Sequence, residues 1–246
     1  MTKIEAYQSE LNLLTDWDDY LLRESGLPGP RGNIELAQAV ANLGNYTLFL
    51  RYLSYNAEIA PVNSPYEFLA FCGTLGLGKL LAGGQGELLQ PLRKLASDPR
   101  WRIREAVAMA LQRLGEVNMP ALISAMCHWS LGTPLEQRAA AAALCEPRLL
   151  AEPAHVRQVL EILDAITASI ASVADRRDKD FLALRKGLGY CWSVAVVALP
   201  VEGKALLEKW LVSKDRDIRW IMQENLKKTR LVRLDASWVE RWQARR

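Results

Sequence analysis

The chain has 246 residues, of which 50% are hydrophobic and 24% are charged, as in an ordinary folded soluble protein with a sizeable core. Its formal net charge of +3 is too small to dictate a class of partner. The N-terminus lacks the basic start and apolar core of a signal peptide, and the longest apolar stretch, around residues 191–201, is too short to span a bilayer. We therefore expect no membrane partner, and four cysteines without redox spacing suit a reducing cytoplasm.

Helical periodicity dominates the chain, and no segment shows the sustained polar–apolar alternation of a half-buried strand. Residues 1–33 predict an N-terminal helix, made acidic by residues such as Glu5, Asp18 and Glu24, and then a connector rich in Pro and Gly over residues 25–33. Residues 34–246 predict one continuous array of paired helices that ends in a capping helix.

The array is predicted to consist of antiparallel helix pairs. The clearest second helix covers residues 100–114, where Ile103, Val107 and Leu111 share one face, Asp98 offers a capping oxygen and Gly115 a stop. Its partner is the leucine-rich segment 88–95. The other pairs are residues 45–56 with 65–81, 119–131 with 134–145, 153–172 with 181–198 and 202–212 with 216–228, and a final helix is expected near residues 237–243.

One local pattern recurs four times: an apolar or amide residue, then Arg, then apolar residues at helical spacing. The arginines are Arg104, Arg138, Arg185 and Arg219, separated by steps of 34, 47 and 34 residues. A repeated helical hairpin cannot bury its own apolar face and must stack on its neighbours. The pattern therefore predicts an all-α protein, an α-solenoid of stacked helical hairpins.

The segment Leu95–Gly115 resembles the consensus of the HEAT-repeat family, an armadillo-type α-solenoid family. In that family an Asp lies in the turn between helices and an apolar–Arg pair opens the second helix, as Asp98 and Ile103–Arg104 do here. Residues 213–226 are similar, although Trp220 and Asn225 are atypical. The resemblance covers roughly residues 65–245 and implies the fold, whereas HEAT arrays serve many unrelated partners.

Two roles compete for the repeated arginines. At the start of a second helix, Arg104 and Arg219 are placed to reach a turn carboxylate, such as Asp98 or Asp215, and so to brace neighbouring repeats. Alternatively, the arginines face a partner on the concave surface formed by the second helices. The residues predicted to bind a partner are Arg102, Arg104, Arg138, Arg185, Arg219 and Trp220.

Residues 73–79 match the Gly-x-x-x-x-Gly-Lys pattern of phosphate-binding loops. The next residue, however, is Leu80 rather than the Ser or Thr that binds magnesium, and the segment has helical periodicity. We expect its glycines to allow close helix–helix approach instead.

Metal and cofactor chemistry have little support in the sequence. The two histidines, His128 and His155, fall on different predicted helices. The four cysteines lack metal-ligand or redox spacing and are expected to be free, buried thiols: Cys72, Cys127, Cys145 and Cys191. We predict no cofactor, no metal and no catalytic residue.

The C-terminal part of the chain is basic and rich in tryptophan. Residues 175–246 hold 17 Lys/Arg and 10 Asp/Glu, a net charge of +7, and four of the eight tryptophans follow residue 205. Aromatic rings among cations suit nucleic-acid backbones, although solvated helix faces explain the charge as well. The basic residues nearest the C-terminus are Lys227, Lys228, Arg230, Arg233, Arg241, Arg245 and Arg246.

Residues 218–239 are similar to the last repeat of the HEAT-like bacterial alkylpurine DNA glycosylases. That family's catalytic aromatic, Asp and Arg residues lie in a central Trp-Asp-rich segment, whereas the only such run here is at residues 16–19. No catalytic residue is therefore carried over.

Three functions remain open at this point. The leading hypothesis is a non-enzymatic scaffold that binds a protein partner on its concave surface. The alternative is a nucleic-acid-binding protein, related to DNA repair, that uses the C-terminal Arg/Lys/Trp-rich face. The third is an enzyme whose site is assembled from scattered residues, for which the sequence names no reaction.

Overall fold

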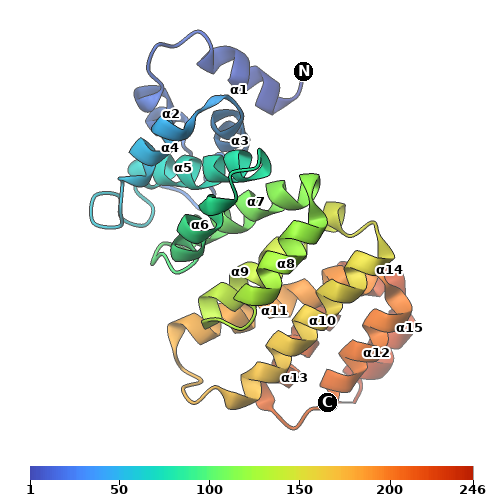
Figure 1. The fold of residues 1–246 in the computed structure, drawn as a ribbon. Helices are drawn as coiled ribbons and strands as arrows, with labels where there is room; N and C mark the ends of the chain where they lie inside the picture. Colours follow the sequence, from blue (N-terminus) through green and yellow to red (C-terminus); the bar gives the residue numbers. More distant parts are fainter. Residues whose placement is uncertain (246) are drawn as a thin grey trace. The chain divides into compact units, whose positions relative to one another are not determined.

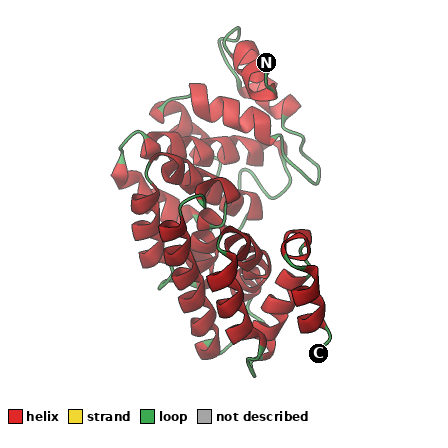
Figure 2. Ribbon diagram, turned by 90° about the vertical axis from the view of Figure 1, so that its right-hand side faces the viewer, coloured by secondary structure: helices red, strands yellow, loops and turns green. Residues whose placement is uncertain are grey.

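A computed structural model describes residues 1–245, and all regular structure in them is helical (Figure 1, Figure 2). The all-α prediction is confirmed, because these residues form 15 α-helices and no strand. The helices are α1 (Lys3–Leu11), α2 (Asp18–Glu24), α3 (Ile34–Leu43), α4 (Tyr46–Leu53), α5 (Pro65–Ala82), α6 (Leu89–Leu95), α7 (Trp101–Val117), α8 (Met119–Trp129), α9 (Pro134–Leu144), α10 (Pro153–Ser169), α11 (Lys179–Ala198), α12 (Pro200–Leu211), α13 (Arg216–Leu226), α14 (Thr229–Leu234) and α15 (Ala236–Gln243), with short 3₁₀ turns at Gly86–Leu88, Pro147–Leu149 and Ile170–Ser172.

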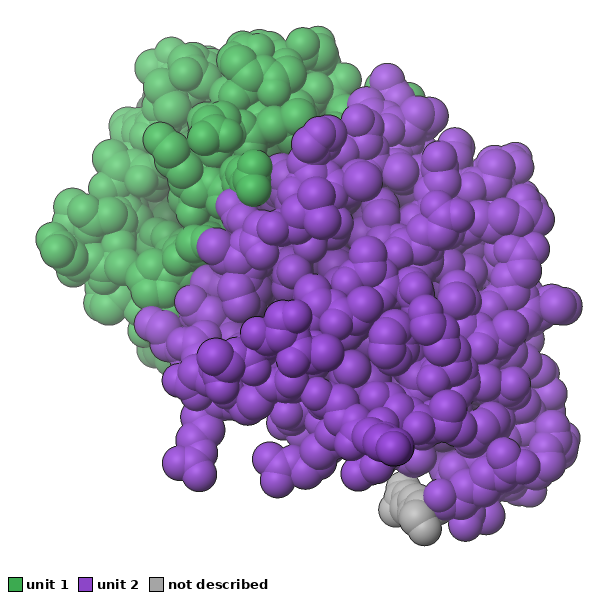
Figure 3. All heavy atoms as spheres, turned by 60° about the horizontal axis from the view of Figure 1, so that its bottom comes forward, with its two compact units in different colours: residues 1–117 green, residues 118–246 purple. Residues whose placement is uncertain are grey.

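The chain divides into two compact units, Met1–Val117 and a second that begins at Asn118, which Figure 3 colours separately. Each unit buries its own set of apolar side chains. That residues 34–246 act as one continuous array stays a prediction, and the units are described in turn.

Several helices begin where the sequence supplies a capping oxygen. Before α5, the Ser64 side chain accepts from the Glu67 N–H. Before α9, Thr133 and Glu136 form a reciprocal capping box. In both helices a proline occupies the first turn, where its missing N–H costs no hydrogen bond. These local preferences explain why the predicted hairpin helices start close to the observed ones.

Helix α5 is central to the first unit and packs against α3, α4 and α7. A Cβ added at Gly76 would lie 2.3 Å from ring carbons of Phe49 on α4, and one at Gly78 would lie 2.5 Å from the Ala110 Cα on α7. Glycine is needed at both positions because the neighbouring helices leave no room for a side chain. The expectation that this glycine-rich run serves helix packing is confirmed.

The N-terminal segment differs from the expectation of one helix. Helix α1 ends at Leu11 and α2 begins at Asp18. The Trp17 indole N–H donates to the Leu11 carbonyl at 3.0 Å, and the Asp16 carboxylate accepts from the Asp18 N–H at 3.2 Å. These bonds supply partners for backbone groups at the break, so the chain turns there. Helix α3 was also not predicted as a separate element.

Helix α7 continues through Gly115 to Val117, so the expected stop at Gly115 is wrong. The Asn118 side chain accepts from the Ala121 N–H at 3.0 Å and begins α8. Gly115 is buried within α7. The capping residue of the next helix therefore marks the boundary.

Three hairpins form the body of the second unit: α8–α9, α10–α11 and α12–α13 (Figure 1). Helix α10 packs against α8 and α12, and α11 packs against α9 and α13. The first helices thus form one layer and the second helices another, which is the stacking of an α-solenoid. Helices α14 and α15 follow, and of these α14 was not predicted.

A buried amide fastens α13 to α11. The Asn225 side chain accepts from the Ser193 N–H at 2.8 Å and donates to the Leu188 and Ile221 carbonyls, each at 2.8 Å. Asn225 is completely buried. Its full complement of partners explains why this residue, atypical for a HEAT repeat, is tolerated in the core.

By length and composition alone, α11 is the one helix within residues 1–245 that would suit a membrane crossing, and 56% of its apolar window is buried inside the protein. The helix lies between α9 and α13. Burial by neighbouring helices is expected for the core helix of a stacked array.

Candidate functional site

Arg185 and Trp220, both predicted to bind a partner, lie together in the second unit. Arg185 is on α11 and Trp220 is on α13, and the guanidinium carbon lies 3.8 Å from the centroid of the indole ring. Nε of Arg185 lies 3.0 Å from Oδ1 of Asp217, which is 7% exposed. The carboxylate and the ring together fix the direction of the guanidinium.

Arg176, which the sequence did not single out, completes this cluster from the loop before α11. Its guanidinium bonds Asp215 at 2.9 Å and Asp217 at 3.3 Å. Burial acts to raise the pKa of Asp215, but hydrogen bonds from the Ile218 N–H and from Arg176 outweigh it and hold the pKa below its usual value. The Asp215 carboxylate at the start of α13 is therefore ionised and paired with Arg176.

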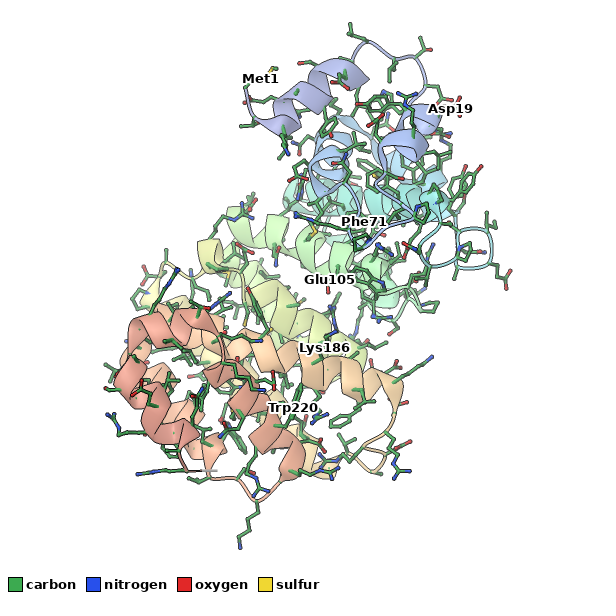
Figure 4. All side chains as sticks on the ribbon, turned by 180° about the vertical axis from the view of Figure 1, so that it is seen from behind. Met1, Asp19, Phe71, Glu105, Lys186 and Trp220 are labelled. Atoms are coloured by element: carbon green, nitrogen blue, oxygen red, sulfur yellow. The ribbon has the colours of Figure 1, made fainter. Side chains whose placement is uncertain are left out.

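Two glycines, Gly187 and the buried Gly189, let side chains of the neighbouring helices approach α11 closely. A Cβ at Gly187 would lie 3.3 Å from the Arg138 Cγ on α9, and one at Gly189 would lie 3.4 Å from the Trp220 ring on α13. Arg138 on α9 and Trp220 on α13 therefore both pack against α11. Lys186, the residue before Gly187, is exposed, and Figure 4 labels it together with Trp220. We call Arg138, Arg185, Lys186 and Trp220 the second-helix face.

A hollow of about 670 Å³ lies where Val197, near the end of α11, meets residues 227–234. Its described lining contains four cations and no acid: Val197, Lys227, Lys228, Thr229, Arg230, Arg233 and Leu234. The Arg230 guanidinium lies 4.5 Å from the Tyr190 ring centroid and donates to the Tyr190 hydroxyl. Tyr190 is 46% exposed. We call this site the basic hollow; sequence analysis listed its cations but did not bring them together.

In the first unit, Arg102 is 5% exposed and is held by Glu67 at 3.1 Å and by the Gly29 carbonyl at 2.6 Å. Glu67 is completely buried. The guanidinium also lies 4.4 Å from the Trp101 ring centroid. These contacts support a structural role for Arg102, and its predicted role in binding stays a prediction.

Arg104 and Arg219 both donate to backbone carbonyls of the turn before their helix, and their expected contacts with turn carboxylates stay predictions. Arg104 donates to the backbone carbonyls of Asp98 and Pro99 at 2.7 and 3.1 Å, and Arg219 donates to the Ser213 carbonyl at 3.4 Å. Both arginines thus satisfy turn carbonyls at the base of their helix.

Other arginines hold the turn carboxylates. Arg100, which is 3% exposed, bonds both oxygens of Asp98 at 2.8 and 2.9 Å and also donates to the Tyr55 carbonyl at 2.8 Å. Arg176 holds Asp215 in the equivalent way. Sequence reasoning missed both, because neither stands at the repeated position.

The C-terminal tryptophans mostly serve packing. Trp210 donates to Asp164 at 2.7 Å, and Trp238 and Trp242 both donate to Glu208 at 2.6 and 3.1 Å. Their indole N–H groups are thus engaged by carboxylates. Trp242 also has the Arg245 guanidinium 4.7 Å from its ring centroid, and Tyr190 is the ring that lies beside Arg230.

The residues considered for metal or nucleotide chemistry lie apart. Within residues 1–245 there is no group of three or more His, Cys, Asp or Glu that could hold a metal ion. Lys79, at the end of the glycine-rich run, donates to the Asn42 and Gly44 carbonyls at 2.6 and 3.0 Å. Cys127 is exposed, so the expectation of four buried thiols is wrong for this residue. Arg246 lies outside the described residues.

No family model and no curated protein matches this chain. Among solved structures, two engineered proteins are similar: one at 16% identity and a TM-score of 0.38, over 92% of this chain and 96% of the other, and one at 14% identity and 0.35, over 87% and 98%. A designed armadillo repeat protein is similar at 13% identity and 0.34, over 86% and 99%. The chain is an all-α repeat protein. This assignment rests on the stacked helices of the chain itself.

Proposed function

We propose that the protein is a non-enzymatic scaffold of the HEAT-repeat type that binds a protein partner through the second-helix face of its second unit. The observation that carries the proposal is the Arg185–Trp220 contact beside Gly189. Arg and Trp are the residue types that most often dominate binding energy at protein interfaces. Here the guanidinium is already oriented, which lowers the entropy lost on binding.

The charge of the face favours an acidic partner. The face carries three cations from two neighbouring helices, Arg138 on α9 and Arg185 and Lys186 on α11, and Asp217 lies beside Arg185. A positive surface speeds association with a negative one and discriminates against basic surfaces. We therefore expect an acidic surface on the partner.

The test is quantitative affinity purification from cells that naturally express the protein. The interface variants are Trp220→Ala and the charge reversal Arg138→Glu with Lys186→Glu. The matched control is Arg148→Glu with Arg157→Glu, because both arginines lie on the second unit outside the face, with side chains 70% and 52% exposed. Circular dichroism and thermal unfolding of each variant establish that it is folded.

A true partner is recovered with the wild-type protein and the control but not with either interface variant. Its affinity is then measured with purified components, where we expect the interface variants to weaken binding by about 10-fold or more. Equal recovery of every captured protein with all variants would refute the proposal.

Nucleic-acid binding is the second candidate, and the basic hollow is the observation that favours it. Its lining cations suit phosphate contact, whereas the C-terminal tryptophans are occupied in packing. Retention of mixed-sequence DNA or RNA at low salt, lost as salt rises, is the expected result. Absence of any affinity at low salt would eliminate this candidate.

A further inference from the structure

The basic hollow gathers positive charge in a short stretch of chain. Lys227, Lys228, Arg230 and Arg233 follow the end of α13 and continue along α14, and all four line one concavity with the Thr229 hydroxyl. Like charges held this close repel one another unless an anion is bound between them. A bound anion would relieve this repulsion, so the anion-bound state of the hollow is favoured over the empty state.

Little within the protein neutralises this charge. Among the described residues, the carboxylate ion pair formed by these four cations is Lys227 with Glu224. Arg230 contacts the neutral Tyr190, and Lys228 lies 5.9 Å from the same ring. The hollow is consequently cationic as it stands.

Both the density of charge and the residue types match phosphate. We propose that the basic hollow is a binding site for a chain of phosphate groups, a ligand that goes beyond the protein partner proposed above. Phosphates in a chain carry charge on successive atoms, whereas acidic side chains of a peptide are singly charged and spaced apart. The guanidinium fork of Arg230 or Arg233 can bond two phosphate oxygens at once.

The size and the preorganisation of the hollow agree with this ligand. A volume of about 670 Å³ lies within the range of small-molecule sites and holds several phosphates. Arg230 is held in place by its contacts with Tyr190, so less freedom is lost when it binds.

Such a chain has two sources, a free polyphosphate or nucleoside triphosphate and the backbone of a nucleic acid. Tyr190, 46% exposed beside the hollow, offers a ring on which a base can stack. The oligonucleotide source rests on the second candidate function, whereas the free polyphosphate source is independent of both candidates.

The experiment is isothermal titration of the full chain, at low salt and without magnesium, with four probes: inorganic tripolyphosphate, ATP, a single-stranded 12-mer oligonucleotide and a polyglutamate of matched charge. The test variant is Arg230→Gln with Arg233→Gln. The matched control, Arg148→Gln with Arg157→Gln, removes the same charge from the same unit outside the hollow. Thermal unfolding shows that each variant is folded.

We expect a phosphate chain to bind the wild-type protein, with an affinity that falls as salt rises. The hollow variant should lose about 10-fold or more, with a shallower salt dependence, and the control should stay within about 2-fold. Tightest binding of the oligonucleotide, weakened by Tyr190→Leu, identifies a nucleic-acid source. Equal or tighter binding of tripolyphosphate or ATP identifies a free polyphosphate.

Three results would each overturn the proposal: no binding of any phosphate chain, equal losses in the hollow and control variants, or polyglutamate binding as tightly as the phosphate probes. The last would indicate an acidic protein at the hollow. None of these results bears on the second-helix face, whose test uses different residues.

Discussion

The guanidinium of Arg185 is held between the Trp220 ring, 3.8 Å from its centroid, and the Asp217 carboxylate, 3.0 Å from Oδ1. The contact joins α11 to α13 and so links two successive repeats. Lys in place of Arg185 would lack the planar group that stacks on the ring while forming an ion pair with the carboxylate. The repeated arginine is therefore a link between repeats as well as part of the proposed binding face.

We predict that Trp220→Leu lowers the free energy of unfolding by about 1 kcal/mol or more, because the cation–π contact and apolar packing are lost. In a double-mutant cycle with Arg185→Met, the coupling energy should be about 0.5–2 kcal/mol. Chemical denaturation measures all four proteins. A cycle of Trp220→Leu with Arg157→Met, a residue outside the cluster, should show coupling near zero, and equal coupling in both cycles would contradict the assignment.

Gly76→Ala should destabilise the first unit by about 1–3 kcal/mol, because the new methyl group overlaps the buried ring of Phe49. Gly86→Ala is the matched control, since a Cβ there meets nothing within 4 Å. Its expected effect on the unfolding midpoint is slight. If the two substitutions behave alike, close packing of α4 on α5 is not what requires glycine at position 76.

Arg102→Met should cost about 3–5 kcal/mol, because it leaves the Glu67 carboxylate buried and unpaired. Breaking the exposed pair of Arg157 with Glu202 by Arg157→Met should cost less than about 1 kcal/mol. Thermal and denaturant unfolding of the two variants measure the difference. Comparable, small losses in both would show that the buried pair is not needed for folding.

The four cysteines should differ in reactivity toward a thiol reagent at neutral pH. Cys127 is exposed, whereas burial raises the pKa of Cys72, and burial followed by contact with the Cys191 thiol raises the pKa of Cys145. We expect one thiol to react rapidly in the native protein and all four after denaturation. Cys127→Ser should abolish the fast phase. A fast phase that survives this substitution would place the reactive thiol elsewhere.

Stability should fall in acid partly through Asp235. The hydrogen bond from Lys204, followed by that from the Trp238 N–H, lowers the pKa of Asp235 to about 2, whereas an unfolded Asp has a pKa of about 3.9. A pKa depressed in the folded state stabilises the protein above the unfolded value, and this contribution is lost as the pH falls from about 4 to about 2.

Asp235→Asn tests this contribution, because Asn keeps a capping oxygen at the start of α15 but does not titrate. The unfolding midpoint of the variant should change less than that of the wild-type protein between pH 4 and pH 2. Parallel curves for the two proteins would exclude Asp235 as a source of the acid sensitivity.

Most helices were predictable from local chemistry. Helices α8 and α9 each have a capping side chain and an early proline, whereas α12 has the proline and α13 the capping Asp215, and in all four the apolar residues recur at helical spacing. The signals were ambiguous where side chains make medium-range bonds, as Trp17 does to the Leu11 carbonyl at the break between α1 and α2. The spacing of apolar residues does not reveal a side-chain bond of this kind.

The candidate site was predictable only in part. The repeat spacing identified Arg185, and Trp220 stood out as atypical, but their contact depends on how α11 packs on α13. Asp98 and Asp215 were recognised as turn residues, whereas their partners, Arg100 and Arg176, lie outside the repeated position. The basic hollow was not predictable, because α14 was not expected and it is α14 that places Arg230 beside Tyr190, 40 residues earlier in the chain.

Caps, prolines and apolar spacing act within a few residues, so they were enough to predict that this chain is helical, that its helices pair, and where most of them begin. They could not predict which cations are buried in ion pairs, as Arg102 is, and which line an exposed hollow, as Arg233 does. Burial and charge pairing depend on the helices that pack alongside, and those neighbours come from distant parts of the chain.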